Sequence, residues 1–492
     1  MPMLVISPQE VYDGLGLENP WWETNRPLER ISAFPERAYL ESFRKLVLQA
    51  EPRRSVVLLG PRRVGKTVMI HQVIAALLRQ GVSGTDIVYA SIDRPLYNGQ
   101  TLETFVRHHL ERTPARRERR NLWFFFDEVQ YMREWERELK SLTDLYPTIK
   151  FVASGSAAAA LRQKSRESGA GRFTDFILPP LTFDEFIAFQ GDRNASLEKL
   201  LAFAQSGFKE PDRLAELDIA FLNILFERYL TFGGYPEAVI SSGVQRNLDR
   251  FVREDIVDKV LLRDLPSLYG ISDTRELNSL FATLCYNTGQ EVSLEGLSQS
   301  SAVAKNTLKR YLEYLEAAFL IRSLTRVDHN ARRFQRQTTF KTYLANPSLR
   351  AALFKPIGQD DDLFGHLAET GVLSQWMHGR DLDGLHYTRW TGGEVDLVYL
   401  APERQKPDWF VEVKWSDRFL NGFHEMKALR AFIEEHRETL TKGVVTTRTK
   451  FAARRHAGVE IEFVPTAVYA WMVGRNTAKA NADDQLELSL TP

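Results

Sequence analysis

The fold is decided by one stretch of the sequence, Ser55-Val56-Val57-Leu58-Leu59-Gly60-Pro61-Arg62-Arg63-Val64-Gly65-Lys66-Thr67. An apolar strand runs into a glycine-framed loop and then into a helix, and the loop has the pattern G-x-x-x-x-G-K-[ST]. Glycine is needed at Gly60 and Gly65 because the backbone must turn tightly and direct its N–H groups at phosphate oxygens. The stretch therefore predicts a P-loop. An ordinary glycine-rich turn between a strand and a helix is the alternative.

The residues of this loop have separate expected roles in binding ATP. Lys66 is expected to reach the β- and γ-phosphates, and the Thr67 hydroxyl is expected to bind Mg²⁺. The helix over residues 68–79 directs its positive N-terminal end at the same anion. The predicted nucleotide-binding residues are Gly60, Pro61, Arg62, Arg63, Val64, Gly65, Lys66, Thr67 and Val68, together with Ser154 and Ser156 from a later strand.

Length and composition limit the classes of protein that remain. The chain of 492 residues is too long for one compact core, so roughly two to four domains are expected. Lys plus Arg number 64, as do Asp plus Glu, so any nucleic-acid surface must be a local patch. The single cysteine, Cys285, excludes an intramolecular disulfide and a cysteine-based zinc site. No apolar run approaches the ~18 residues of a membrane span. A cytoplasmic protein without a membrane contact is expected.

An acidic pair follows one of the later strand candidates. These candidates lie at residues 87–92, 122–127, 149–154 and 176–178, and the helical segments between them predict an α/β fold with a parallel sheet. A carboxylate at the end of a buried strand is costly unless it serves a cation. Asp127 is therefore expected to hold Mg²⁺ through water, and Glu128 to orient or deprotonate the attacking water. The alternative is an exposed acidic turn.

Another strand candidate lies between the P-loop strand and the Asp127 strand, and this order resembles that of ATPases with an extra central strand and a catalytic glutamate. In that class the next strand supplies a polar sensor of the γ-phosphate, which here would be Ser154 or Ser156. Arg172 lies in a glycine-rich loop and is a candidate arginine finger that would act on a neighbouring subunit of a homo-oligomer. An ordinary surface arginine is the open alternative.

The middle of the chain is predicted to be helical. Residues 180–265 look like an ATPase lid, and a helix at 274–286 is followed by segments with helix-turn-helix lengths, up to residue 320. This pattern predicts a winged helix, with Ser293 as a helix N-cap and strands at 321–327 and 339–344. Winged helices bind DNA or dock proteins, and both uses stay open. The polar and basic residues expected to face DNA are Lys305, Asn306, Lys309 and Arg310, with Arg332, Arg333 and Arg336 on the wing.

The last third carries a second set of candidate catalytic residues. Glu369 lies in a predicted helix at 364–377, Asp396 in a strand at 394–399, and Glu412 and Lys414 in a strand at 410–414. Residues two apart on a strand share a face, so Glu412 and Lys414 point together. Glu369, Asp396 and Glu412 would bind Mg²⁺ or Mn²⁺, and Lys414 would position water or stabilise the transition state. A degenerate site used only for binding is the alternative.

These motifs together resemble a known family. The chain is similar to prokaryotic AAA+-like P-loop ATPases fused to a C-terminal winged helix and a PD-(D/E)xK restriction-endonuclease-like domain. The resemblance is carried by Asn19-Pro20-Trp21-Trp22, the P-loop, Asp127-Glu128 and Glu412-Val413-Lys414. It implies an ATPase core with an N-terminal helical segment at 1–179, a helical lid at 180–265, a winged helix at 266–338, a nuclease-like α/β domain at 339–472 and a flexible tail at 473–492.

Two functions follow from this reading of the sequence. The first is an ATP-hydrolysing DNA-processing enzyme of repair, replication or defence, in which hydrolysis moves or gates DNA toward a metal-dependent nuclease site. The second is an ATP-switched module that binds DNA or protein and has an inactive nuclease-like domain. The ending from Gln485 to Leu490 also resembles peptides that dock on the sliding clamp, although a frayed tail with accidental leucines explains it as well.

Overall fold

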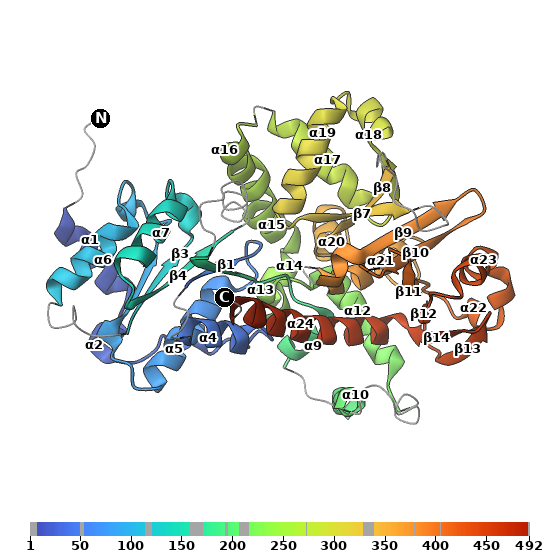
Figure 1. Ribbon diagram of the computed structural model, residues 1–492, viewed down its shortest axis with the longest axis horizontal. Coiled ribbons are helices and arrows are strands. Elements are labelled where there is room, and N and C mark those ends of the chain that lie inside the picture. The colour runs from blue at the N-terminus through green and yellow to red at the C-terminus, as the bar shows by residue number, and fades with distance from the viewer. Residues whose placement is uncertain are drawn as a thin grey trace. The chain divides into compact units, whose positions relative to one another are not determined.

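The chain forms two compact units in a computed structural model (Figure 1). Unit 1 comprises Met1–Pro179 and Lys479–Pro492, and unit 2 comprises Pro180–Ala478. The structure describes residues 7–49, 54–113, 121–156, 171–191, 195–205, 216–271, 273–327, 339–377, 380–403 and 405–490. Within these ranges no helix has both the length and the apolar character needed to cross a membrane.

Unit 1 is built on a five-stranded parallel sheet with the order β2-β3-β4-β1-β5. The parallel sheet predicted from the sequence is therefore confirmed, and β4 separates the P-loop strand from the strand that ends in Asp127. The side chains of β1 and β4 are buried throughout, as expected for central strands covered on both faces. The strands are β1 (Ser55–Leu59), β2 (Ile87–Ser91), β3 (Leu122–Asp127), β4 (Ile149–Gly155) and β5 (Phe173–Ile177).

The helical segment at the N-terminus of unit 1 is divided into short helices. Helix α3 ends at Ser32, and α4 begins only at Leu40. Pro35 lies in this gap, and proline interrupts a helix because it lacks the N–H donor. The helices in chain order are α1 (Pro8–Glu18), α2 (Trp21–Thr24), α3 (Glu29–Ser32), α4 (Leu40–Leu48), α5 (Lys66–Arg79), α6 (Leu102–Arg112) and α7 (Trp135–Leu145).

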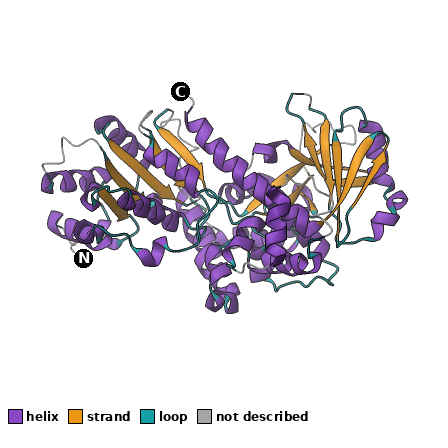
Figure 2. Cartoon of the chain, turned by 90° about the horizontal axis from the view of Figure 1, so that it is seen from below, coloured by secondary structure: helices purple, strands orange, loops and turns teal. Residues whose placement is uncertain are grey.

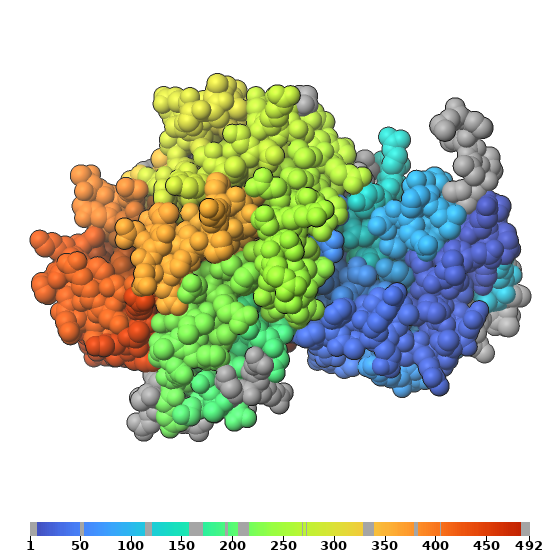
Figure 3. Space-filling model, turned by 180° about the vertical axis from the view of Figure 1, so that it is seen from behind, coloured from blue at the N-terminus to red at the C-terminus, as the bar shows by residue number. Residues whose placement is uncertain are grey.

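Unit 2 begins with a helical region, which contributes to the green and yellow-green surface in Figure 3. Its first helix, α9, has a capping box in which Thr182 and Glu185 satisfy each other's backbone N–H groups. Two π-helical turns, Arg253–Val257 and Val260–Asp264, occur near its end. The helices are α9 (Phe183–Phe189), α10 (Ala195–Gln205), α12 (Ile219–Phe232), α13 (Pro236–Ile240), α14 (Ser242–Arg246), α15 (Leu248–Val252) and α16 (Leu265–Tyr269).

Among the described residues, this helical region is followed by three helices and three strands. Strand β8 pairs antiparallel with both β6 and β7, so it lies between them. Ser293 caps α18 as predicted, because its hydroxyl accepts a hydrogen bond from the N–H of Gly296 at 2.9 Å. The wing arginines Arg332, Arg333 and Arg336 lie outside the described residues. The elements are α17 (Thr274–Tyr286), β6 (Glu291–Ser293), α18 (Leu294–Ser301), α19 (Lys305–Ala317), β7 (Ile321–Val327) and β8 (Thr339–Leu344).

The sheet of unit 2 continues past the predicted domain boundary at residue 338. Parallel pairing of β7 with β9 joins the strands into one sheet of order β13-β14-β12-β11-β10-β9-β7-β8-β6, the larger of the two in Figure 2. The last third of the chain therefore shares one sheet with the helix-and-strand region before it. The remaining elements are α20 (Ser348–Leu353), α21 (Phe364–Leu373), β9 (Leu385–Trp390), β10 (Gly393–Leu400), β11 (Pro407–Glu412), α22 (Arg418–Asn421), α23 (Lys427–His436), β12 (Lys442–Thr447), β13 (Ala452–His456) and β14 (Val459–Pro465).

The end of the chain is a helix where the sequence predicted a flexible tail. Helix α24 spans Thr466–Leu490, and alanine is frequent in it, which favours helix over an irregular tail. Position 474 of this helix requires glycine, because the backbone there packs closely against Gln375 and Thr182. A Cβ atom at this position would lie 2.6 Å from the Gln375 Oε1 atom. The side chains from Gln485 to Leu490 lie outside the described residues, so clamp docking stays a prediction.

Candidate functional site

The P-loop lies between β1 and α5 and requires glycine at both ends. Gly65 has a φ angle of +98°, which favours glycine, and it is the N-cap of α5. A Cβ atom on Gly60 would lie 2.2 Å from the carbonyl oxygen of Leu178. The loop places Lys66 and Thr67 in the first turn of α5, where backbone N–H groups and the helix dipole favour an anion. This geometry agrees with the phosphate-binding role predicted from the sequence.

Lys66 is buried against its own loop. Its ammonium donates hydrogen bonds to the carbonyl oxygens of Gly60 at 3.0 Å and Pro61 at 2.7 Å. Carbonyl oxygens are weaker partners for an ammonium than anionic phosphate oxygens. The lysine is therefore held at the anion-binding end of α5 by contacts that a phosphate can replace.

Asp127, at the end of β3, accepts hydrogen bonds from three hydroxyl groups. Its Oδ2 atom accepts from Thr67 Oγ1 at 2.7 Å and from the Tyr89 hydroxyl at 2.9 Å. Its Oδ1 atom accepts from Ser154 Oγ and from the N–H of Glu128 at 3.1 Å. The structure thus brings together Thr67, Asp127 and Ser154, which the sequence predicted as metal ligands and sensor.

Tyr89 is a residue of this site that sequence reasoning missed. It lies on β2, next to β3, and burial together with Asp127 raises the pKa of its hydroxyl well above the ordinary value. The hydroxyl therefore stays protonated and donates to Asp127. The sequence carried one indication of this contact. Tyr89 and Ser91 are two residues apart on one strand and therefore share a face. Ser91 pairs with Asp127, so Tyr89 lies on the face that Asp127 adjoins.

Glu128 is connected to the sensor strand through Gln130. The Gln130 amide nitrogen donates to Glu128 Oε2, and its amide oxygen accepts from the N–H of Ser156 at 3.1 Å. Burial raises the pKa of Glu128, against the lowering effect of Lys66, and a raised pKa suits a general base. Within the described part of the chain, the buried hydroxyl of Ser156 has no hydrogen-bond partner. A buried hydroxyl without a partner and a set of anion-binding N–H groups both fit ATP and Mg²⁺ at this site.

Arg172 lies far from the P-loop of its own chain. It directly precedes β5, whose first residue pairs with Ser55 at the start of β1, whereas the P-loop follows the end of β1. The two ends of a five-residue strand are about 13 Å apart. Arg172 is 43% exposed and forms an ion pair with Asp144, with Nε and Oδ1 2.8 Å apart. It therefore does not reach the P-loop of its own chain in this arrangement, and its role on a neighbouring subunit stays a prediction.

The predicted residues of the second site do come together in unit 2. Lys414 Nζ lies 2.8 Å from Glu412 Oε1 and 3.5 Å from Asp396 Oδ2. The N–H of Val413 donates to Asp396 Oδ2 at 2.9 Å, which fixes the carboxylate against β11. Glu369 approaches from α21. Glu369, Asp396 and Lys414, but not Glu412, line a pocket of about 500 Å³. The other residues that line it include Glu291, Lys341, Asp362, His366, Arg389, Glu394, Val413 and Trp415.

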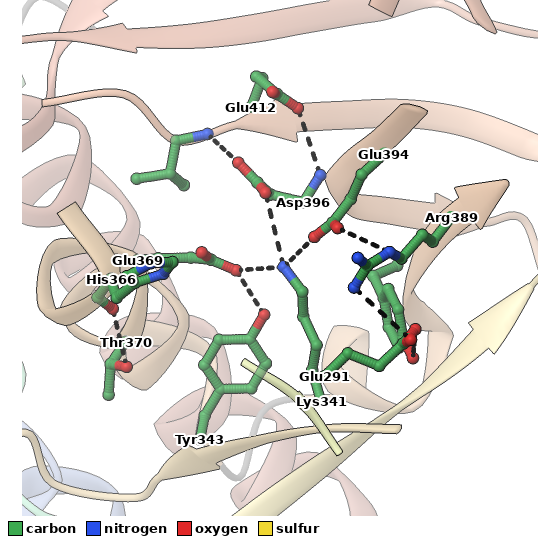
Figure 4. A network of polar contacts seen from close by, with 12 residues as sticks. Glu291, Lys341, Tyr343, His366, Glu369, Thr370, Arg389, Glu394, Asp396 and Glu412 are labelled. Carbon is green, nitrogen blue, oxygen red and sulfur yellow. Dashed lines mark hydrogen bonds and ion pairs between the residues drawn. The ribbon is translucent and has the colours of Figure 1, made fainter. Parts of the chain in front are cut away.

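Lys341 on β8 joins Glu369 to Asp396, and sequence reasoning missed it (Figure 4). Its ammonium lies 3.0 Å from Glu369 Oε1, 2.5 Å from Glu394 Oε1 and 3.5 Å from Asp396 Oδ1. Tyr343, two residues along the same strand, donates its hydroxyl to Glu369 Oε1 at 2.6 Å. The available signal was a lysine and a tyrosine at a spacing of two in the predicted strand at 339–344, which places both on one face.

The charges of this cluster shift each other's pKa values. Burial raises the pKa of Glu369 to about 7, against the lowering effect of Lys341. Burial likewise raises the pKa of Glu412 to about 7. Burial alone would raise the pKa of Asp396, but Lys414 and Lys341 outweigh it and lower that pKa. Asp396 is therefore the carboxylate that stays charged between the two ammonium groups.

The carboxylates are not arranged as the predicted metal site. Within the part of the chain that the structure describes, no group of three or more His, Cys, Asp or Glu side chains is placed to hold a metal ion. Glu369 and Asp396 are instead bridged by the Lys341 ammonium, and Asp396 and Glu412 by that of Lys414. The ammonium groups of Lys341 and Lys414 therefore balance the negative charge of the carboxylates, as a divalent cation would in a metal site. The ligand set Glu369, Asp396 and Glu412 is thus brought together in a form that does not fit Mg²⁺ or Mn²⁺.

The raised pKa values predict how stability depends on pH. Glu369 and Glu412 titrate near pH 7 in the folded chain and near 4.5 when unfolded, so the folded chain binds more protons between these values. The free energy of unfolding should therefore fall as pH rises from about 4.5 to about 7, by roughly 3 kcal/mol per group. Asp396, with its lowered pKa, acts in the opposite direction only below pH 3.8. Urea unfolding at several pH values measures this, and Glu369→Gln with Glu412→Gln should flatten the profile. A stability that rises across this window in the wild type would contradict the assignment.

Comparison with known proteins supports the assignment of unit 1. Residues 52–187 match the family model of the AAA domain, and residues 223–361 match a domain of unknown function, DUF8612. An uncharacterized protein of Haemophilus influenzae is 25% identical over 415 residues, which cover 83% of this chain and 92% of the relative. The uncharacterized protein MJ1637 of Methanocaldococcus jannaschii is 23% identical over 411 residues, covering 78% of this chain and 81% of the relative. These relatives show that the sequence similarity extends well beyond the AAA domain.

Solved structures of two nucleotide-bound proteins resemble part of the chain. The Saccharomyces cerevisiae Hsp104–ADP complex matches with a TM-score of 0.29 and 16% identity, over 59% of this chain and 40% of Hsp104. AMPPCP-bound DnaA from Aquifex aeolicus matches with a TM-score of 0.26 and 16% identity, over 57% of this chain and 87% of DnaA. The family match, the parallel sheet and the P-loop together show that unit 1 carries an AAA-type ATPase domain.

Proposed function

We propose that this protein hydrolyses ATP in unit 1 and uses hydrolysis to act on DNA through unit 2. The observation that supports the ATPase part best is the cluster around Asp127, in which hydroxyls from α5, β2 and β4 converge on one carboxylate next to Lys66 and Glu128. Such a cluster is costly to bury unless it serves a cation and an anion together. ATP with Mg²⁺ supplies both and provides the phosphoryl group that is transferred to water.

Different residues of unit 1 have different proposed roles in ATP hydrolysis. Lys66 and the N–H groups of the P-loop bind the phosphates, and Thr67 with Asp127 holds Mg²⁺. Glu128 accepts the proton of the attacking water, and Gln130 orients its carboxylate. Ser154 and Ser156 lie on the neighbouring strand end, where they respond to the phosphate that leaves. Arg172 is proposed to act on the neighbouring subunit of a homo-oligomer, because it does not reach its own P-loop.

The DNA-binding part of the proposal rests on helix α19. The order α17, β6, α18, α19, β7 and β8, with β8 between its two neighbours, is that expected of a winged helix. Asn306, Lys309 and Arg310 are exposed on the first half of α19, where a recognition helix contacts DNA. Lys305 is held by an ion pair with Glu295. The exposed face of α19 is therefore the proposed DNA contact.

Reversing one charge on this face tests the contact. Arg310→Glu should weaken duplex DNA binding roughly tenfold or more at low salt, because a phosphate contact is replaced by repulsion, and it should reduce the salt dependence. Fluorescence anisotropy with a labelled duplex at several salt concentrations measures both effects. Arg275→Glu, an equal change at an exposed position of α17, is the matched control and should bind like the wild type. Equal losses in the two variants would show that only net charge matters.

The acidic pocket supports two candidate roles. The D…E-x-K sequence pattern favours a metal-dependent nuclease, with Asp396, Glu412 and Lys414 as its reactive residues. The ion pairs made by Lys341 favour the alternative, an ATP-switched module that binds DNA or protein without cleaving, because the carboxylates already have counter-charges.

A cleavage assay separates these two roles. Linear and branched DNA substrates are incubated with Mg²⁺ or Mn²⁺, with and without ATP. If the pocket is a nuclease site, the wild type should cleave DNA, and Asp396→Asn and Lys414→Met should not. Arg310→Glu should still cleave at high DNA concentration. DNA binding that ATP alters, without cleavage by any variant, supports the binding module instead.

A further inference from the structure

Lys341 occupies a central place in the acidic pocket. Its side chain is buried, with 4% exposed, and it reaches three carboxylates from β8. Two of the contacted oxygens, Glu369 Oε1 and Asp396 Oδ1, belong to residues that a divalent cation would need (Figure 4). A buried ammonium is stable only when such partners surround it. The pocket is therefore built around this lysine.

A divalent cation and the Lys341 ammonium exclude each other at these oxygens. Mg²⁺ binds carboxylate oxygens at about 2.0–2.1 Å. The Lys341 ammonium lies 3.0 Å from Glu369 Oε1 and 3.5 Å from Asp396 Oδ1. A metal ion bound to these two oxygens would therefore lie directly beside the ammonium. Like charges at that separation repel strongly in a buried site. One of the two cations has to leave.

The backbone of Lys341 is fixed by strand pairing, so any displacement of its ammonium has to come from the side chain. Strand β8 pairs on both sides, and Lys341 is opposite Glu291 on β6 and Leu324 on β7. Its third partner, Glu394, is 29% exposed, so the ammonium keeps one carboxylate as it turns toward solvent. Lys414 differs, because it approaches Asp396 through the other oxygen, Oδ2, and pairs with Glu412. Removal of Lys341 would leave the Lys414 contacts in place.

We infer that Lys341 is the resident cation of the acidic pocket and determines whether the pocket takes a divalent metal ion. With Lys341 between Glu369 and Asp396 the pocket is charge-balanced and closed to metal. With the ammonium displaced, Glu369 Oε1 and Asp396 Oδ1 become available. This control of metal binding by Lys341 does not depend on nuclease activity. Only its consequence, that DNA cleavage requires displacement of the Lys341 ammonium, rests on the proposed nuclease function.

Chemical labelling of lysines in the wild-type full chain tests the inference directly. Reductive methylation without nucleotide, followed by mass spectrometry, should leave Lys341 almost unlabelled while the exposed Lys309 of α19 is labelled. Mn²⁺ should increase the labelling of Lys341 in step with its binding. The same titration on Asp396→Asn should show no such metal-dependent increase. Lys341 that stays protected while Mn²⁺ binds at a site removed by Asp396→Asn would overturn the inference.

A direct binding measurement gives the second test. Lys341→Met keeps the length of the side chain and removes its charge. Its nucleotide-free Mn²⁺ affinity, measured by electron paramagnetic resonance of free Mn²⁺, should exceed that of the wild type roughly tenfold or more, because the repulsion is gone. Adding Asp396→Asn should abolish the gain. Equal affinities in wild type and Lys341→Met would contradict the inference. If Lys341→Met does not fold, Lys341→Met with Glu394→Gln removes one uncompensated carboxylate. Neither test uses ATP or DNA, so a protein without nuclease activity still gives a clear answer.

Discussion

Glu128→Gln should abolish ATP hydrolysis while leaving ATP binding nearly unchanged. The substitution keeps the size of the side chain and a hydrogen-bonding oxygen near Gln130, but it removes the carboxylate that accepts a proton from water. The turnover rate should fall by about a hundredfold or more, since general-base contributions are typically of that size. Steady-state phosphate release measures hydrolysis, and a fluorescent ATP analogue measures binding.

The matched control for this experiment is Glu103→Gln. Glu103 is exposed on α6 and forms no part of the nucleotide site, so both hydrolysis and binding should equal those of the wild type. If Glu128→Gln retains more than about a tenth of the wild-type rate, then Glu128 is not the base that activates water. A loss of binding in Glu128→Gln would instead indicate a disturbed P-loop.

Lys341→Met should lower the free energy of unfolding by about 3–5 kcal/mol, because removal of one partner leaves buried carboxylates without their counter-charge. The three partners that lose the ammonium are Glu369, Glu394 and Asp396. Urea unfolding of the full chain, followed by tryptophan fluorescence, measures the difference. Lowering the pH should restore part of the loss, since the carboxyl groups then become neutral.

Two further variants separate the charge effect from simple loss of packing. Lys341→Met with Glu369→Gln should recover part of the lost stability, because one unpaired carboxylate is removed with the lysine. Lys414→Met should cost less than Lys341→Met, since Lys414 is 29% exposed and water can solvate its partners. A loss in Lys341→Met that is no larger than in Lys414→Met, with no recovery in the double variant, would show that the ion pairs do not stabilise the fold.

The sequence was sufficient to predict the sites that depend on local order. The P-loop was predictable because its glycines, Lys66 and Thr67 are adjacent in the chain, and Asp127-Glu128 because they end an apolar strand. The residues of the second site were also predictable as a set, since Asp396 lies on β10 and Glu412 at the end of the neighbouring β11. Lys414 lies two residues beyond that end, because the strand predicted at 410–414 stops at Glu412. Patterns within single short stretches of the chain carried all of these predictions.

The sequence did not reveal the contacts between distant segments. Lys341 is 28 residues from Glu369 in the chain, and nothing in either segment indicates that an ammonium would take the place of a metal ion. Tyr89 contacts Asp127 across 38 residues, which follows from the pairing of β2 with β3. The helix α24 was missed for another reason, because its polar end suggested a tail although its composition favours helix.

The most direct test of the central claim, that ATP hydrolysis in unit 1 serves DNA bound by unit 2, is the ATPase rate of the full chain with and without DNA. Single-stranded, duplex and branched DNA are added in turn at low salt. At least one of them should stimulate hydrolysis several-fold in the wild type and in Arg275→Glu, and the stimulation should be lost in Arg310→Glu while the basal rate is kept. A rate that none of these DNA substrates changes, in a chain that hydrolyses ATP and loses activity with Glu128→Gln, would contradict the coupling.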